Sequence, residues 1–77
     1  MDVWIVLFSE GGWGSDLVGI YTSPDLAFAA IVQYNEREKH GALNTGVVQE
    51  AWGTIYYCDD GSYEIQHYRL DDMPANW

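Results

Sequence analysis

The chain is poor in basic residues and has no long apolar run, and each shortage excludes a class of function. Three Lys and Arg residues stand against twelve Asp and Glu residues, so the 77-residue chain has a formal net charge of −9. So few cations cannot neutralise enough phosphates for direct nucleic-acid binding, and the negative charge disfavours a membrane surface. The longest apolar run covers only residues 3–8, which is far too short to span a bilayer.

Cysteine is also scarce, because Cys58 is alone and an internal disulfide is therefore excluded. The N-terminus lacks the basic residues that open a secretory signal peptide. Both absences predict a cytoplasmic protein. The length predicts a single domain over residues 1–77, with residues 71–77 as a loose tail.

Aromatic side chains, in contrast, are abundant, with four Trp, six Tyr and two Phe residues. Each can bury about 150–250 Å², which suits the dense core that a small domain needs. Trp and Tyr also dominate the binding energy of protein–protein interfaces. Together with the surplus of negative charge, they favour a compact acidic binding protein over an enzyme.

The clearest local signal is a helix start, in which Ser23 caps the helix, Pro24 fits its first turn and Asp25 complements the helix dipole. Apolar residues then recur at helical spacing and form one packing stripe. The helix is expected to end near His40, where Gly41 supplies a left-handed cap. The stripe consists of Leu26, Ala27, Ala30, Ile31 and Tyr34.

Runs of β-branched and aromatic residues predict four strands around this helix. Residues 47–51 are expected to form only a short extended lead-in. The four strands are expected over residues 3–8, 17–21, 52–58 and 62–70.

This order predicts an α+β fold, β-β-α-β-β, in which an antiparallel four-stranded sheet has one helix packed on one face. The apolar run 3–8 belongs in the interior of the sheet. With the strands numbered along the chain, the orders 2-1-4-3 and 2-1-3-4 both satisfy this condition. Asp60-Gly61 is a two-residue hairpin signal, and the resulting register pairs Cys58 with Tyr63.

One helix covers only one face of such a sheet, so the other face keeps several large side chains. A face of this kind implies a protein partner, a second copy of the chain, or the tail folding back. Homodimer formation through it is therefore one of the expected possibilities.

The acidic residues divide between the two ends of the sheet under either strand order. Glu10 and Asp16 fall at one end, Asp2 and Asp25 at the other, and each end gains one of two Asp pairs. Carboxylates two residues apart on a strand lie roughly 6.6–6.8 Å apart, which is comparable to the spacing of phosphates along DNA. The alternative interpretation is that Asp residues occupy turns and termini and serve solubility.

Two tryptophans, Trp13 and Trp77, are required by no core position and are candidate anchors for a partner. The complete set of predicted partner-binding residues is Glu10, Trp13, Asp16, Asp59, Asp60, Asp71, Asp72 and Trp77.

No catalytic residue, metal ligand or cofactor is predicted. In the predicted register Cys58 and His67 lie roughly 13 Å apart, which is too far for a shared zinc ion. Cys58 also has no base beside it that could activate it as a nucleophile. The glycine-rich residues 11–14 have no following Lys and are flanked by acids, so they do not form a phosphate loop.

Three segments carry a resemblance to a known group of proteins: WIVL at 4–7, GIYTSPDLAFAAI at 19–31 and YEIQHYRLD at 63–71. The chain resembles small uncharacterised phage and bacterial proteins with a β-β-α-β core and the pattern VWVL…GVYSSEEEAxAAI…YxIxEYxLD. The resemblance covers about half of the chain, and residues 45–60 depart from it as an added strand. It implies a phage or mobile-element origin and carries over no catalytic residue.

These observations predict a small, acidic, non-enzymatic binding protein. We expect a phage or mobile-element inhibitor that blocks the basic surface of a host nucleic-acid-binding defence protein, in the manner of an anti-CRISPR or a DNA mimic. It would act in the cytoplasm of the host cell. The alternative is a housekeeping or structural homodimer with no inhibitory role, and a third possibility is a small hydrolase that uses His67 or Cys58.

Overall fold

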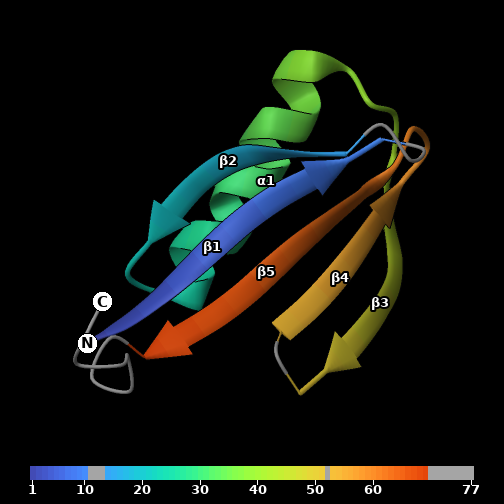
Figure 1. Cartoon of the computed structure of the whole chain (residues 1–77). Helices are drawn as coiled ribbons and strands as arrows, with labels where there is room; N and C mark the ends of the chain where they lie inside the picture. Colours follow the sequence, from blue (N-terminus) through green and yellow to red (C-terminus); the bar gives the residue numbers. More distant parts are fainter. Residues whose placement is uncertain (11–13, 52, 70–77) are drawn as a thin grey trace.

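One antiparallel sheet of five strands, with one helix on one of its faces, makes up the computed structural model (Figure 1). The structure describes residues 1–10, 14–51 and 53–69. The strands lie side by side in the order β2-β1-β5-β4-β3. The elements are β1 (Asp2–Ser9), β2 (Ser15–Tyr21), α1 (Pro24–Glu38), β3 (Leu43–Glu50), β4 (Gly53–Cys58) and β5 (Ser62–Arg69).

The predicted α+β fold is confirmed, and β1 lies in the interior of the sheet between β2 and β5. Of the two strand orders, the one that places the C-terminal strand beside β1 is correct. The sheet has one strand more than the four predicted, because β3 pairs with β4 at the outer edge. The sequence LNTGVVQE lacks the apolar alternation of a half-buried strand, so only its pairing with β4 reveals it.

The helix begins as predicted, because the Ser23 hydroxyl accepts a hydrogen bond from the Leu26 N–H at 3.1 Å. Its end differs from the prediction. The helix stops at Glu38, and Lys39 rather than Gly41 takes the left-handed cap conformation, with a φ of 55°. Gly41 also has a positive φ of 88°, but it lies in the connection to β3, where a side chain would collide with that of Asp59.

The core lies between α1 and the two central strands β1 and β5. The helix turns a slightly different side to the sheet than predicted, because Leu26 is 53% exposed whereas Asn35 is buried. Ala27, Ile31 and Asn35 follow one another at intervals of four residues, which places them on one line along the helix. The buried apolar residues are Val6, Phe8, Ala27, Ile31, Tyr63 and Ile65.

The predicted register of the β4–β5 hairpin is wrong by two residues. Tyr56 rather than Cys58 pairs with Tyr63, and the Cys58 N–H donates to the Gly61 carbonyl at 3.0 Å. The two residues between Cys58 and Gly61 are Asp59 and Asp60, so the turn lies one position earlier than the predicted Asp60-Gly61. Because side chains alternate with a period of two, a shift of two residues leaves every side chain on its predicted face.

The second face of the sheet, which we call the open face, is covered by no other element among the described residues. Figure 1 shows α1 behind β1 and β2, and the near side of the sheet uncovered. The strand registers place the following described side chains on the open face: Val3, Ile5, Leu7, Leu17, Ile20, Ile55, Tyr57, Glu64, Gln66 and Tyr68. Within the described ranges, no helix is both long and apolar enough to cross a membrane.

Candidate functional site at the acidic end of the sheet

Five carboxylate side chains lie at one end of the molecule, which we call the acidic end. Because β1 runs antiparallel to both β2 and β5, the end of β1, the start of β2 and the β4–β5 loop meet there (Figure 1). The C-terminus of α1 reaches the same end and adds two cations, Arg37 and Lys39. The acidic end consists of Glu10, Asp16, Glu38, Asp59 and Asp60.

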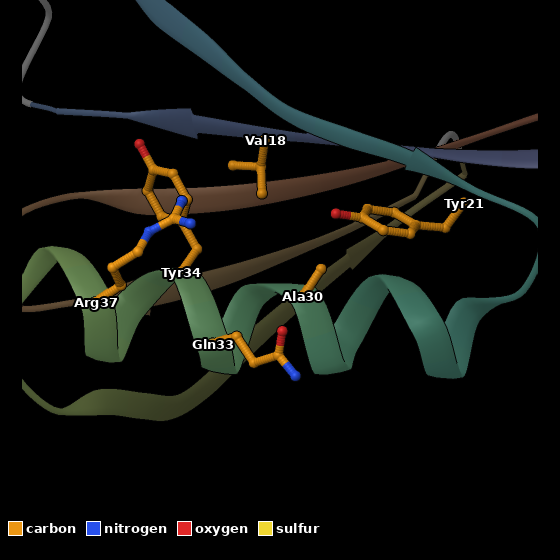
Figure 2. A pocket seen from close by; sticks show the side chains of 6 residues that line it. All are labelled: Val18, Tyr21, Ala30, Gln33, Tyr34 and Arg37. Atoms are coloured by element: carbon orange, nitrogen blue, oxygen red, sulfur yellow. The ribbon is translucent and has the colours of Figure 1, made fainter.

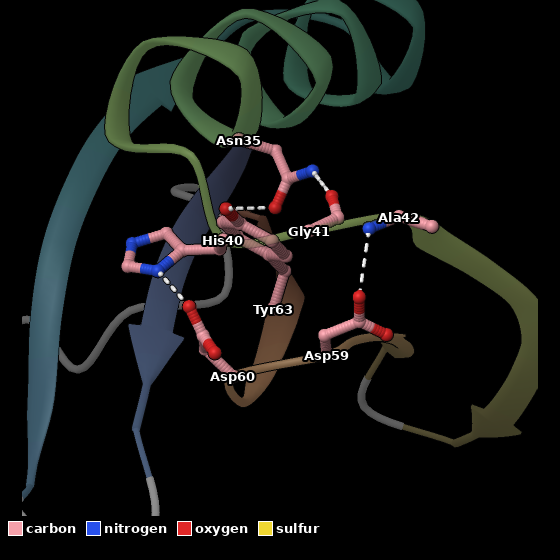
Figure 3. A network of polar contacts seen from close by, with 7 residues as sticks. All are labelled: Asn35, His40, Gly41, Ala42, Asp59, Asp60 and Tyr63. Carbon is pink, nitrogen blue, oxygen red and sulfur yellow. Dashed lines mark hydrogen bonds and ion pairs between the residues drawn. The ribbon is translucent and has the colours of Figure 1, made fainter.

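Two of these carboxylates hold the connection between α1 and β3 to the β4–β5 loop (Figure 3). Asp60 Oδ2 lies 3.1 Å from Nδ1 of His40, and Asp59 Oδ2 accepts a hydrogen bond from the Ala42 N–H at 3.2 Å. The His40 ring also stacks on Phe8, with 4.3 Å between the ring centroids. These contacts tie both residues of the β4–β5 turn to residues 40–42.

A buried polar contact lies directly behind this connection. The Tyr63 hydroxyl donates to Oδ1 of Asn35 at 2.9 Å, and Nδ2 of Asn35 donates to the Gly41 carbonyl at 2.8 Å (Figure 3). Asn35 thus links the helix, β5 and the α1–β3 connection. Its signal in the sequence is an amide four residues after Ile31, on the line that Ala27 and Ile31 begin, and the predicted packing stripe did not include it.

Glu10 and Asp16, in contrast, are exposed and make no hydrogen bond or ion pair with any described residue. They flank a pairing of Ser9 with Ser15, whose hydroxyl oxygens are 2.8 Å apart, so they lie on neighbouring strand ends. Glu38 faces Arg37 at 3.9 Å, and an exposed pair of this kind contributes only about 0–1 kcal/mol.

The negative potential at this end acts on Tyr34. Burial raises the pKa of the Tyr34 phenol, and the carboxylates of Glu38, Asp16 and Glu10 raise it further. Arg37, whose guanidinium lies 5.5 Å from the centroid of the Tyr34 ring, lowers it. The acidic end therefore has a negative field in spite of its two cations.

The opposite end of the sheet is different, because Asp2, the carboxylate on the strand end there, is paired. Oδ1 of Asp2 lies 3.2 Å from Nε2 of His67 and 3.5 Å from Nε of Arg69. The His67 ring stacks flat on Trp4, with 4.6 Å between centroids. The one cation of the chain that lies away from the helix C-terminus is thus paired with Asp2.

The structure brings four of the eight predicted partner-binding residues together: Glu10, Asp16, Asp59 and Asp60. Only Glu10 and Asp16 project without a partner among the described residues, whereas Asp59 and Asp60 serve the fold. The sequence predicted that one of two Asp pairs lies at the same end as Glu10 and Asp16, and the structure shows that this pair is Asp59-Asp60. Trp13, Asp71, Asp72 and Trp77 lie outside the described residues.

The residues with chemical reactivity are dispersed or already engaged. Both histidines stack on aromatic rings and pair with carboxylates, and no hydroxyl or thiol of the described residues hydrogen-bonds to either of them. Cys58 is a free, half-buried thiol. Across the described ranges, no three His, Cys, Asp or Glu side chains gather closely enough to hold a metal ion.

An open pocket of about 330 Å³ lies between α1 and β2, beside the acidic end (Figure 2). The Tyr21 ring folds back across Gly19, and a side chain at that position would collide with it. Arg37 covers the Tyr34 ring and is the one charged group that lines the pocket. The lining residues are Val18, Tyr21, Ala30, Gln33, Tyr34 and Arg37.

Alkaline pH is expected to destabilise the fold through Tyr63. Burial, followed by nearby acidic groups, raises the pKa of the Tyr63 phenol far above its ordinary value of 10.0. Because the folded state holds this proton more tightly than the unfolded state, the contribution is complete below pH 10 and falls as the pH rises further. Urea unfolding from pH 9 to 11 should show this decline, and Tyr63→Phe should flatten it. An equal decline in both proteins would exclude Tyr63 as its source.

No protein-family model, curated protein or solved structure matches the chain. The resemblance to small phage and bacterial proteins therefore stays a prediction.

Proposed function

We propose that the chain is a non-enzymatic binding protein whose acidic end engages a basic surface of a nucleic-acid-binding protein and blocks it. In this proposal the bound nucleic acid and the acidic end compete for the same Lys and Arg side chains. With the phage or mobile-element origin that the resemblance predicts, the partner would be a host defence protein.

The observation that carries the proposal is the difference between the two ends of the sheet. Asp2 is paired with Arg69 and His67 at one end, whereas Glu10 and Asp16 have no partner among the described residues at the other. Exposed, unpaired carboxylates on adjacent strands cost the isolated protein some self-repulsion, and a basic partner relieves it. Complementary charge of this kind gives fast and selective association with a basic surface.

The rigid support of the acidic end also favours binding. Ser9 and Ser15 join the two strand ends that carry Glu10 and Asp16, and the contacts of Asp59 and Asp60 fix the neighbouring loop. Carboxylates on rigid elements lose little conformational entropy when they bind, so more of the interaction energy appears as affinity.

The test is capture from a bacterial lysate with matched charge variants as bait. Glu10→Gln/Asp16→Asn removes two negative charges from the acidic end. Asp2→Asn/Asp25→Asn removes the same number from the opposite end. We expect the wild type and the second variant to capture a basic nucleic-acid-binding protein at low salt and to release it at high salt. The first variant should bind it about 10-fold more weakly, which corresponds to about 1.4 kcal/mol.

Competition with duplex DNA distinguishes a blocked nucleic-acid site from a contact elsewhere on the partner. Added DNA should displace the captured protein from the wild-type bait. If both double variants capture the protein equally well, or if DNA has no effect, the proposed function is wrong.

A further inference from the structure

The open face of the sheet differs from the rest of the molecule in carrying almost no charge. Leu17 and Ile20 on β2 are 61% and 59% exposed, and Tyr57 and Tyr68 are exposed as well. Among its described side chains, Glu64 is the one that carries a charge. A face with so little charge and so many exposed apolar side chains, on a protein of net charge −9, marks a surface that another apolar surface covers.

Three polar side chains of the open face form a row along β5 and are hydrogen-bonded to one another. The Tyr68 hydroxyl donates to Oε1 of Gln66 at 3.0 Å, and Nε2 of Gln66 donates to Oε2 of Glu64 at 2.9 Å. Apolar residues of β1 and β4 flank this row on both sides. The row can therefore enter an interface with few polar groups left unpaired.

This charge pattern does not suit the basic surface that the acidic end attracts. The open face offers a basic partner only the Glu64 carboxylate, which is already hydrogen-bonded to Gln66. Its apolar side chains would gain nothing from contact with Lys or Arg. A second copy of the chain has the complementary chemistry, because it presents an equally apolar face and keeps its own carboxylates at the sheet ends and on the helix.

We propose that the open face is the interface of a homodimer. A two-fold axis across the strands at Gln66 lays β5 against β5 in opposite directions. It places Glu64 opposite Tyr68 of the second copy. Ile5 and Ile20, which align with Gln66 across the sheet, then lie against their own equivalents.

The size of the face fits a modest but specific dimer. Four strands about 4.8 Å apart, each about seven residues long at about 3.3 Å per residue, span roughly 450 Å². Because side chains roughen the surface, two such faces would bury roughly 1,000 Å² in total. This area lies at the lower limit for a stable protein–protein interface.

Sedimentation equilibrium tests the dimer with charge substitutions at side chains that are already exposed in the single chain. We expect the wild type to sediment as two 8.7 kDa chains at tens of micromolar. Ile20→Glu and Leu17→Glu should each weaken the dimer by at least about 30-fold, the effect of losing a major interface side chain. Leu26→Glu is the matched control, because Leu26 is 53% exposed on α1 and lies away from the open face.

Salt and Glu64 provide two independent readouts. Both copies are negative, so higher salt should tighten the dimer, whereas it weakens binding of a basic partner to the acidic end. Glu64→Gln should also tighten the dimer, because it removes a carboxylate from the interface. A wild type that stays monomeric at about 200 μM overturns the proposal and means that something other than a second copy covers the open face. A dimer that survives Ile20→Glu, or that is lost equally in Leu26→Glu, overturns it too.

Discussion

Ile31→Ala should lower the free energy of unfolding by about 2–5 kcal/mol, the range for removing a large aliphatic side chain from a core. Ile31 is fully buried between α1 and the central strands. A domain of this length has only about 4–12 kcal/mol of stability at about 0.05–0.15 kcal/mol per residue, so the variant should lose a large share of it. Urea denaturation followed by circular dichroism measures the change.

Leu26→Ala on the same helix is the matched control. Leu26 is 53% exposed, so its replacement should change the stability by no more than about 0.5 kcal/mol. Equal losses for the two variants would mean that Leu26 packs against the sheet as the sequence predicted, and would contradict its exposed position on the helix.

Asn35→Ala should have the second largest effect, a loss of about 2–4 kcal/mol. It removes the hydrogen bonds with Tyr63 and Gly41, each of which contributes about 1 kcal/mol, and it leaves the buried Tyr63 hydroxyl without its acceptor. Thermal unfolding monitored by near-ultraviolet circular dichroism, which reports on Tyr63 and its neighbours, measures the loss.

A double-mutant cycle separates this contact from a general packing defect. Tyr63→Phe alone should cost about 1–3 kcal/mol, because Oδ1 of Asn35 then remains buried and unpaired. The double variant should be more stable than the sum of the two single losses implies, by about 0.5–3 kcal/mol. Strict additivity would contradict a direct contact between the two side chains.

Much of the fold could be predicted because its signals are local. Ser23, Pro24 and Asp25 define the helix start in any context, and the apolar run 3–8 requires an interior strand. The end of the helix was harder to predict, because Lys39 adopts a left-handed conformation that favours glycine, and Gly41 lies two residues further on. The cap is set by the hydrogen bond from the Lys39 N–H to the Asn35 carbonyl.

The hairpin register and the fifth strand depend on contacts between distant segments. Asp60-Gly61 is a strong local turn signal, but Asp59 and Asp60 are held by Ala42 and His40, which are 17 and 20 residues away in the chain. The turn propensity of a short segment does not predict contacts with residues so far away in the chain. β3 likewise exists because β4 offers it a free edge.

The candidate site shows the same division between local and distant information. Strand direction alone brings Glu10 and Asp16 to one end, and this part was predictable. Which carboxylates remain unpaired was not, since Asp2 meets Arg69 only when β1 and β5 lie side by side. The charge of a residue is visible in the sequence, whereas its partner is a property of the fold.

The most direct test of the account is to map where a basic ligand contacts the chain. We would titrate the ¹⁵N-labelled protein with a poly-arginine peptide at low salt and follow the amide resonances by NMR. We expect the largest shifts at Glu10, Asp16 and Glu38, small shifts at Asp2 and Asp25, and loss of binding at high salt. Equal shifts at both ends, or shifts centred on the open face, would contradict the assignment of the acidic end as the binding surface.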